Sequence, residues 1–138
     1  MKPNPELVSE TKAWFRKAAH DLRMAELAVR DEPAMTDQAV YHAQQAVEKA
    51  MKGLLTWHEH VFRKTHNLVE LGEACAGFAP VLVSLLRRAA AGLSDYAWQY
   101  RYPGDGDEPD VAEAEAALNL ARETVTALRA ALPPEARS

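Results

Sequence analysis

The sequence predicts an all-α protein, an antiparallel up-and-down four-helix bundle with an additional short helix between the second and third long helices. Three observations lead to this fold class. Four segments repeat apolar residues at alternating steps of three and four, which places one apolar stripe along one face of a helix. Segments containing proline or glycine separate them. No segment shows convincing strand alternation, so helices with one apolar face each pack most simply against antiparallel neighbours.

The length and composition of the chain predict a single hydrophobic core. It has 138 residues, of which 48% are hydrophobic and 26% charged. These are ordinary values for a globular domain and argue against wholesale disorder. We therefore expect residues 1–132 to form a single helical domain and residues 133–138 to form a disordered tail.

Several classes of protein are excluded by composition. No apolar run approaches the ~20 residues that a membrane-spanning helix requires, and the first six residues do not resemble a secretory signal. The single cysteine, Cys75, agrees with a reducing compartment. The formal net charge of −4 gives no general attraction for DNA. We expect a cytoplasmic protein that contacts neither a membrane nor DNA at large.

The first two predicted helices are the longest. Asn4 or Ser9 caps the first, which ends before Pro33. Thr36 or Asp37 caps the second, which runs to about His60. Its apolar stripe consists of Val40, Ala43, Val47, Ala50, Leu54, Trp57 and Val61. Beside the stripe runs a polar face richer than solubility requires, made of His42, Gln44, Gln45, Glu48, Lys49 and Lys52.

The short helix follows at Asn67, because Asn67 and Glu70 have the spacing of a capping box, and Gly77 is suited to end it. Pro80 fits the first turn of the next long helix, whose stripe reaches Tyr100.

The last long helix begins after Pro109. Its apolar stripe is unbroken until Pro133 and consists of Val111, Ala114, Leu118, Ala121, Val125, Leu128 and Leu132. Many stripe positions of the chain are alanine, which fills less volume than leucine. Aromatic side chains or a second copy of the chain must compensate, and we expect a homodimer because twofold pairing is the commonest assembly.

Metal and cofactor motifs are not convincing. A helical zinc-protease site needs histidines four residues apart, but His58 and His60 are two apart and point in different directions on a helix. The glycine-rich phosphate loops and the nucleophile elbow of common enzyme classes are missing from the sequence. No metal site, cofactor or catalytic residue is predicted.

A basic group, Arg63, Lys64 and His66, stands just before the short helix. Free backbone N–H groups at a helix N-terminus favour anions, so Lys64 and His66 are candidate phosphate-binding residues. The same charges can instead solvate a loop and pair with neighbouring carboxylates, as surface charges usually do. Both interpretations stay open at this point.

A second candidate group surrounds Arg101. In an up-and-down bundle the end of the helix before Arg101 lies at the same end as the start of the second helix, which brings Arg101 and Tyr102 towards Tyr41, His42 and Gln45. Such a group can bind a phosphate and a base. Alternatively, it closes the bundle as a purely structural contact.

Three segments, residues 41–52, 64–68 and 100–103, resemble the prokaryotic HEPN domain family, and the similarity extends over about residues 14–132. The resemblance implies an all-α up-and-down bundle that forms dimers. It also implies a nucleotide-binding role and pairing with a small nucleotidyltransferase encoded alongside, in the manner of a toxin–antitoxin pair. Some members of the family cleave RNA as toxins.

The RNA-cleaving members carry Arg-x(4–6)-His, and this sequence departs from that pattern. Gly106, Asp107 and Glu108 stand where the histidine after Arg101 belongs. Without an imidazole there is no obvious group to transfer a proton beside the arginine. The leading interpretation is a non-catalytic subunit that binds a nucleotide or a partner. The alternatives are a metal-independent RNase toxin in which His42 or His66 substitutes across a dimer, and a purely structural helical adaptor.

Overall fold

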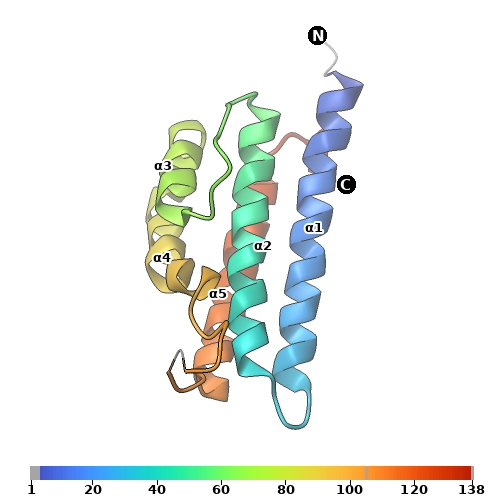
Figure 1. The fold of residues 1–138 in the computed structure, drawn as a ribbon. Helices are drawn as coiled ribbons and strands as arrows, with labels where there is room; N and C mark the ends of the chain where they lie inside the picture. Colours follow the sequence, from blue (N-terminus) through green and yellow to red (C-terminus); the bar gives the residue numbers. More distant parts are fainter. Residues whose placement is uncertain (1–3, 105, 138) are drawn as a thin grey trace.

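The computed structural model describes residues 4–104 and 106–137, and within these ranges every regular element is helical (Figure 1). The all-α fold class is confirmed. No helix in the described ranges is long and apolar enough to cross a bilayer. The elements are α1 (Pro5–Arg30), α2 (Thr36–Trp57), α3 (Leu68–Phe78), η1 (Pro80–Leu82), α4 (Val83–Leu93), η2 (Ser94–Ala97), α5 (Val111–Ala130) and α6 (Pro134–Arg137).

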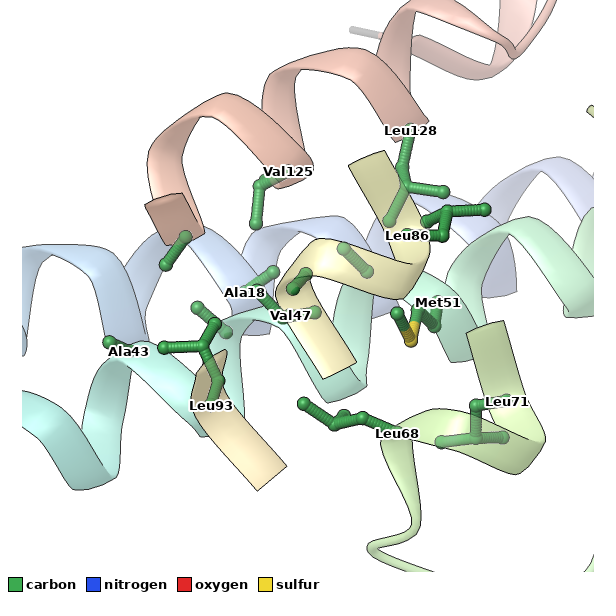
Figure 2. Packing of buried hydrophobic residues seen from close by; sticks show 14 of the residues in the cluster. Ala18, Ala43, Val47, Met51, Leu68, Leu71, Leu86, Leu93, Val125 and Leu128 are labelled. Carbon is green, nitrogen blue, oxygen red and sulfur yellow. The ribbon is translucent and has the colours of Figure 1, made fainter. Parts of the chain in front are cut away.

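Helix α2 is the central element. In Figure 1 it lies between α1 on one side and the α3–α4 pair on the other, with α5 behind. Helices α1 and α2 run antiparallel. Figure 2 shows side chains of α2 packed among those of α1, α3, α4 and α5. Nine apolar residues of α2 are completely buried: Ala39, Val40, Ala43, Ala46, Val47, Ala50, Met51, Leu54 and Leu55.

The ends of the first two helices settle choices that the sequence left open. Asn4 caps α1, since its Oδ1 accepts from the Glu6 backbone N–H at 2.9 Å. Helix α2 begins at Thr36 without a side-chain cap and ends at Trp57, short of the predicted His60. Glu59 adopts a left-handed conformation with φ of 54°, which stops the helix. Val61 therefore leaves the predicted stripe and is 92% exposed.

The predicted third long helix is shorter than expected. Helix α4 covers only 11 residues, between the 3₁₀ turns η1 and η2. At its end, Ser94 Oγ donates to the Ala90 carbonyl at 2.5 Å, a local bond that competes with helix continuation. Tyr100 has φ of 63°, so the backbone turns away from the helical path there. The chain enters the loop before Arg101 instead of carrying a helix up to it.

The chain after Pro133 differs from the expected disordered tail. Residues Pro134–Arg137 form the short helix α6, which contacts α1. Ala136 is only 1% exposed, and Arg137 Nε donates to the Leu132 carbonyl at 2.6 Å. Ser138, the last residue of the predicted tail, lies outside the described residues. The alanine is buried because it packs with the core cluster, a contact that the two prolines before it do not prevent.

Candidate binding sites along helix α2

The first candidate site is a corner formed by the start of α2 and the segment after η2. The Arg101 guanidinium carbon lies 5.6 Å from the centroid of the Tyr41 ring and 6.0 Å from that of the Tyr102 ring. Both distances are within the range of cation–π attraction. The corner contains a cavity of about 210 Å³ lined by Asp37, Gln38, Tyr41, Gln99, Tyr100 and Arg101. The structure thus brings Arg101, Tyr41 and Tyr102 together.

The backbone conformation of Tyr100 shapes this corner. A φ of 63° is uncommon for a residue with a side chain, and such conformations persist only where the surrounding contacts hold them. The Tyr100 ring lies 6.4 Å from that of Tyr96, whose hydroxyl donates to Glu113 Oε2 at 2.6 Å. Burial raises the pKa of Tyr100, and the negative charges of Glu113 and Asp107 raise it further. Tyr100 therefore stays a neutral hydrogen-bond donor in the cavity wall.

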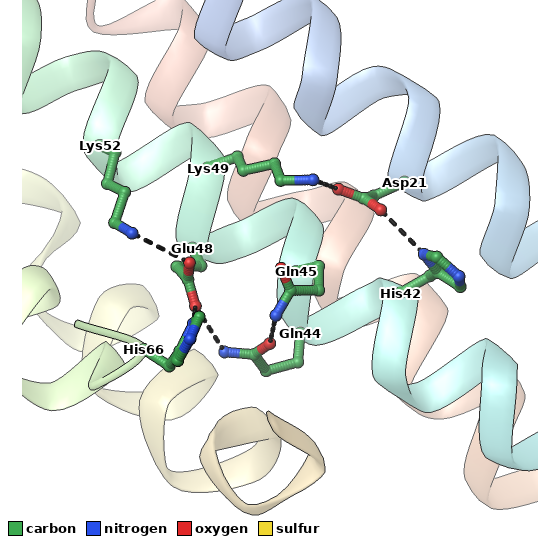
Figure 3. Close-up of polar contacts among 8 residues, drawn as sticks. All are labelled: Asp21, His42, Gln44, Gln45, Glu48, Lys49, Lys52 and His66. Carbon is green, nitrogen blue, oxygen red and sulfur yellow. Dashed lines mark hydrogen bonds and ion pairs between the residues drawn. The ribbon is translucent and has the colours of Figure 1, made fainter. Parts of the chain in front are cut away.

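His42 is adjacent to this corner but is held from the side of α1. Its ring meets the Tyr41 ring edge to face at 5.3 Å. Its Nδ1 lies 2.8 Å from Asp21 Oδ1, while Lys49 Nζ donates to Asp21 Oδ2 at 2.5 Å (Figure 3). Burial alone would raise the pKa of Asp21, but the hydrogen bonds from His42 and Lys49 and their positive charges outweigh it and leave that pKa below its ordinary value. His42 is thus fixed to a buried carboxylate.

A second polar group surrounds Glu48, which is only 3% exposed. Glu48 accepts hydrogen bonds from Lys52 Nζ at 3.0 Å and from Gln44 Nε2 at 3.3 Å. Its Oε1 also lies 2.8 Å from Nδ1 of His66. Gln45, predicted to join Arg101, instead donates its amide to Gln44 Oε1 at 2.8 Å (Figure 3). The polar face of α2 is therefore divided between two hydrogen-bonded networks, one around Asp21 and one around Glu48.

Lys64 and His66 belong to this second group. Together with Trp14, Lys52, Phe62 and Thr65 they line a recess of about 510 Å³. The Trp14 and Phe62 rings meet edge to face with centroids 6.2 Å apart. Lys52 Nζ lies 5.8 Å and 5.9 Å from the centroids of these two rings. The recess thus combines two aromatic rings with cationic side chains.

The predicted phosphate site at the start of α3 is wrong in one respect. Two of its backbone N–H groups are occupied, because Asn67 Oδ1 accepts from Val69 and Glu70 at 3.0 and 3.1 Å. Arg63 is occupied as well, since its Nε contacts both carboxylate oxygens of Glu70 at 2.9 and 3.1 Å. Of the basic group before α3, Lys64 alone makes no ion pair with the described residues.

The predicted site residues therefore fall into two places. Tyr41 and Glu48 are seven residues apart on α2, which is about 10 Å along the helix axis. Arg101, Tyr102 and Tyr41 gather at the first place and Lys64 and His66 at the second. His42 and Gln45 are engaged with partners of their own.

Two residues of these sites were missed as site residues by sequence reasoning: Asp21, which holds His42 and Lys49, and Trp14, which lines the recess beside Glu48. A signal for Asp21 existed, because it stands three residues after Ala18 and four before Ala25, both of which are completely buried. A carboxylate at that position must find partners inside the bundle. Trp14 stands four residues before Ala18, so it borders the same buried face.

His58 and His60, weighed above as metal ligands, pack against one aromatic ring. His58 stacks on Phe78 at 4.3 Å between centroids, and His60 meets the same ring edge to face at 5.6 Å. Burial lowers the pKa of His58. Among residues 4–104 and 106–137, no three histidine, cysteine or acidic side chains are grouped to hold a metal ion.

A family model described as HEPN domain matches residues 11–131, which include both candidate sites. No curated protein and no solved structure matches the chain. The family match covers most of the 138 residues, from α1 to the end of α5.

Proposed function

Because the chain belongs to the HEPN domain family, we propose that it is a non-catalytic subunit that binds a nucleotide and acts with a small nucleotidyltransferase. The nucleotide part rests on the Arg101 guanidinium, whose carbon lies 5.6 Å from the centroid of the Tyr41 ring and 6.0 Å from that of the Tyr102 ring. It makes no ion pair with a carboxylate among the described residues. An arginine held in this way is available for a phosphate.

The chemistry of the corner suits a nucleotide. The guanidinium can donate two parallel N–H bonds to phosphate oxygens, and the exposed Tyr102 ring offers a face on which a base can stack. The amides of Gln38 and Gln99, which line the same cavity, can both donate and accept at the edge of a base. Catalysis is not part of the proposal, because the positions after Arg101 lack the histidine of the RNA-cleaving members.

Thermal unfolding tests the nucleotide part. A ligand that binds only the folded state stabilises it by about 2.7 kcal/mol at a concentration of 100 times Kd. ATP or GTP at millimolar concentration is expected to raise the Tm of the wild type more than that of Arg101→Gln. Arg16→Gln, which also removes one exposed arginine, is the matched control and should respond like the wild type. Unmoved melting curves for the wild type would remove the proposal's support.

The proposal includes two protein partners. Family membership supports a nucleotidyltransferase, and capture of the tagged chain from its native host followed by mass spectrometry tests it.

A second copy of the chain is supported by Met24, Leu27 and Met35, which are 50%, 52% and 45% exposed. These residues border an apolar cavity of about 670 Å³ between α1 and α2. Exposed apolar groups of this kind mark interaction surfaces.

A second candidate function is metal-independent RNA cleavage by a displaced histidine. The observation that favours it is the contact of His66 Nδ1 with Glu48, because a carboxylate that holds one ring nitrogen leaves the other as a proton acceptor. The His66 side chain is 71% exposed, whereas that of His42 is 20% exposed. Single-stranded RNA incubated with chelator should then be cleaved by the wild type and left intact by His66→Ala. If both proteins leave the RNA intact and nucleotide does not change the Tm, the remaining interpretation is a purely structural helical adaptor.

A further inference from the structure

The recess beside Glu48 is bounded by two aromatic rings that meet at an angle. Trp14 comes from α1 and Phe62 from the segment between α2 and α3, and their planes meet at 67°. Both side chains are only partly buried, so part of each ring faces the cavity of about 510 Å³. Two partly exposed rings at an angle offer a stacking surface for a third planar ring.

The side chains around this recess carry an excess of positive charge. Lys52 is balanced by Glu48, with 3.0 Å between Nζ and Oε2. Lys64 has no such counterion among the described residues, and its side chain lines the same recess. His66 uses Nδ1 for Glu48, so its Nε2 stays available at the rim. An anionic group therefore finds the Lys64 ammonium next to the aromatic surface, and Nε2 of His66 can accept a hydrogen bond from a hydroxyl group of the same ligand.

The walls of the recess are held in place before any ligand arrives. Gly53 of α2 packs so closely against α1 that a Cβ there would lie 2.6 Å from the Phe15 ring and 3.1 Å from Trp14 Cβ. The opposite wall is tied by Thr65 Oγ1, which accepts from the Asn67 N–H at 3.0 Å. A prearranged site loses less conformational entropy on binding than a mobile one.

We infer that this recess is a second ligand site, for a planar aromatic ring that carries a phosphate or another anionic group. The ring stacks on one of the two aromatic side chains and meets the other edge to face, and the anion pairs with Lys64. This site is separate from the Arg101 corner. It rests on the proposed function only for the choice of a mononucleotide as the probe.

Fluorescence of Trp14 tests the site directly. In a Trp57→Phe/Trp98→Phe background Trp14 is the only tryptophan, so emission excited selectively at the indole reports the recess. Adenosine 5′-monophosphate is expected to quench it saturably, adenosine to quench it at higher concentration, and ribose 5-phosphate to leave it unchanged. Lys64→Gln should raise the Kd for the monophosphate about tenfold, as loss of a hydrogen bond to a charged group does, and should leave the Kd for adenosine unchanged.

Two control variants make the result specific. Arg63→Gln removes the neighbouring charge that Glu70 already holds, so the Kd should stay as in the background protein. Arg101→Gln separates the two sites. If it reduces the rise in Tm that nucleotide causes and leaves Trp14 quenching intact, both proposals stand. If nucleotide stabilises the protein while Trp14 does not respond, the recess proposal is overturned and the Arg101 proposal survives. If Trp14 is quenched and nucleotide raises the Tm of Arg101→Gln as much as that of the wild type, the recess proposal stands and the Arg101 proposal fails.

A measurement on the wild type covers the case in which the double variant does not fold. Each tryptophan gives one indole N–H signal in a heteronuclear NMR spectrum, and the signal of Trp14 is the one that persists in both Trp57→Phe and Trp98→Phe. Adenosine 5′-monophosphate must shift that signal progressively until it saturates. An unmoved Trp14 signal at millimolar nucleotide overturns the inference, as does a shift that Lys64→Gln leaves equally strong.

Discussion

Oε1 of Glu48 lies 2.8 Å from Nδ1 of His66, and this contact joins the buried face of α2 to the exposed segment before α3. The same carboxylate holds Lys52 at 3.0 Å. A carboxylate that is 3% exposed is costly to leave in a bundle unless hydrogen bonds satisfy it, and here three side chains do so. Glu48 is thus the point at which the core and the second candidate site depend on each other.

Substitution of Glu48 is therefore expected to destabilise the fold. In Glu48→Ala the 9% exposed Lys52 loses its counterion, and removal of one partner of a buried pair costs about 3–5 kcal/mol. Urea unfolding monitored by circular dichroism measures this change. Glu70→Ala is the matched control, because Glu70 also holds one cation, Arg63, but at the surface. Equal midpoints for the two variants would contradict the role given to Glu48.

Acid unfolding reports on Asp21. Its pKa in the folded protein lies below the ordinary value of 3.8, because the hydrogen bonds from His42 and Lys49 outweigh burial. The stabilisation is therefore complete above the pKa of the unfolded chain and is lost as pH falls through the lower pKa of the folded state. Asp21→Asn should lower the free energy of unfolding at neutral pH and flatten its decline below about pH 4. Asp37→Asn is the reference variant. If the free energy of unfolding of Asp21→Asn declines at low pH as steeply as that of the reference, Asp21 does not contribute to the pH dependence of stability.

Gly53→Ala tests the close approach of α1 and α2. An added Cβ meets the Phe15 ring at 2.6 Å, and overpacking of this kind typically costs about 1–3 kcal/mol. Gly77→Ala in α3 is the comparison, since a Cβ there meets nothing within 4 Å. Alanine favours a helix over glycine by up to about 1 kcal/mol, so Gly77→Ala should raise the Tm and Gly53→Ala should lower it. Stabilisation of both variants would contradict the close approach, because it would show that α1 and α2 can accommodate a Cβ at position 53.

The exposed apolar group of α1 tests the homodimer. Leu27→Lys places a charge in the middle of the surface proposed for a second copy, where an unpaired buried charge is unfavourable. Light scattering after size exclusion should report a dimer for the wild type and a monomer for Leu27→Lys. Val81→Lys changes a residue that is 90% exposed on η1 and should remain dimeric. A monomeric wild type at micromolar concentration would contradict the prediction.

Much of the fold could be predicted from the sequence because helical periodicity is a local property. The stripe of α2 from Val40 to Leu54 is buried as predicted, and Asn4 and Asn67 cap the helices that follow them. The errors occur where backbone conformation depends on contacts between distant residues. The left-handed residues Glu59 and Tyr100 end regular structure at points that periodicity alone does not mark.

The candidate sites were predictable only in part. Connectivity brought Arg101 towards Tyr41, and the structure has them in contact. Side-chain partners were not predictable, because hydrogen-bond choice depends on the rotation of each helix about its axis. Gln45 therefore bonds to Gln44 and His42 to Asp21, although both stand beside Tyr41 or within one turn of it. Trp14 is far from Phe62 in sequence, and only packing joins them.

The burial of α2 limits how the specificity of such a protein can change. Its polar residues are tied to the interior, so a new side chain at Gln44 or Glu48 alters recognition and folding together. Arg101 and Lys64 are exposed and lie on connecting segments, so a substitution there leaves the core intact. Divergence towards new ligands should therefore accumulate in these two loops while the central helix stays constant.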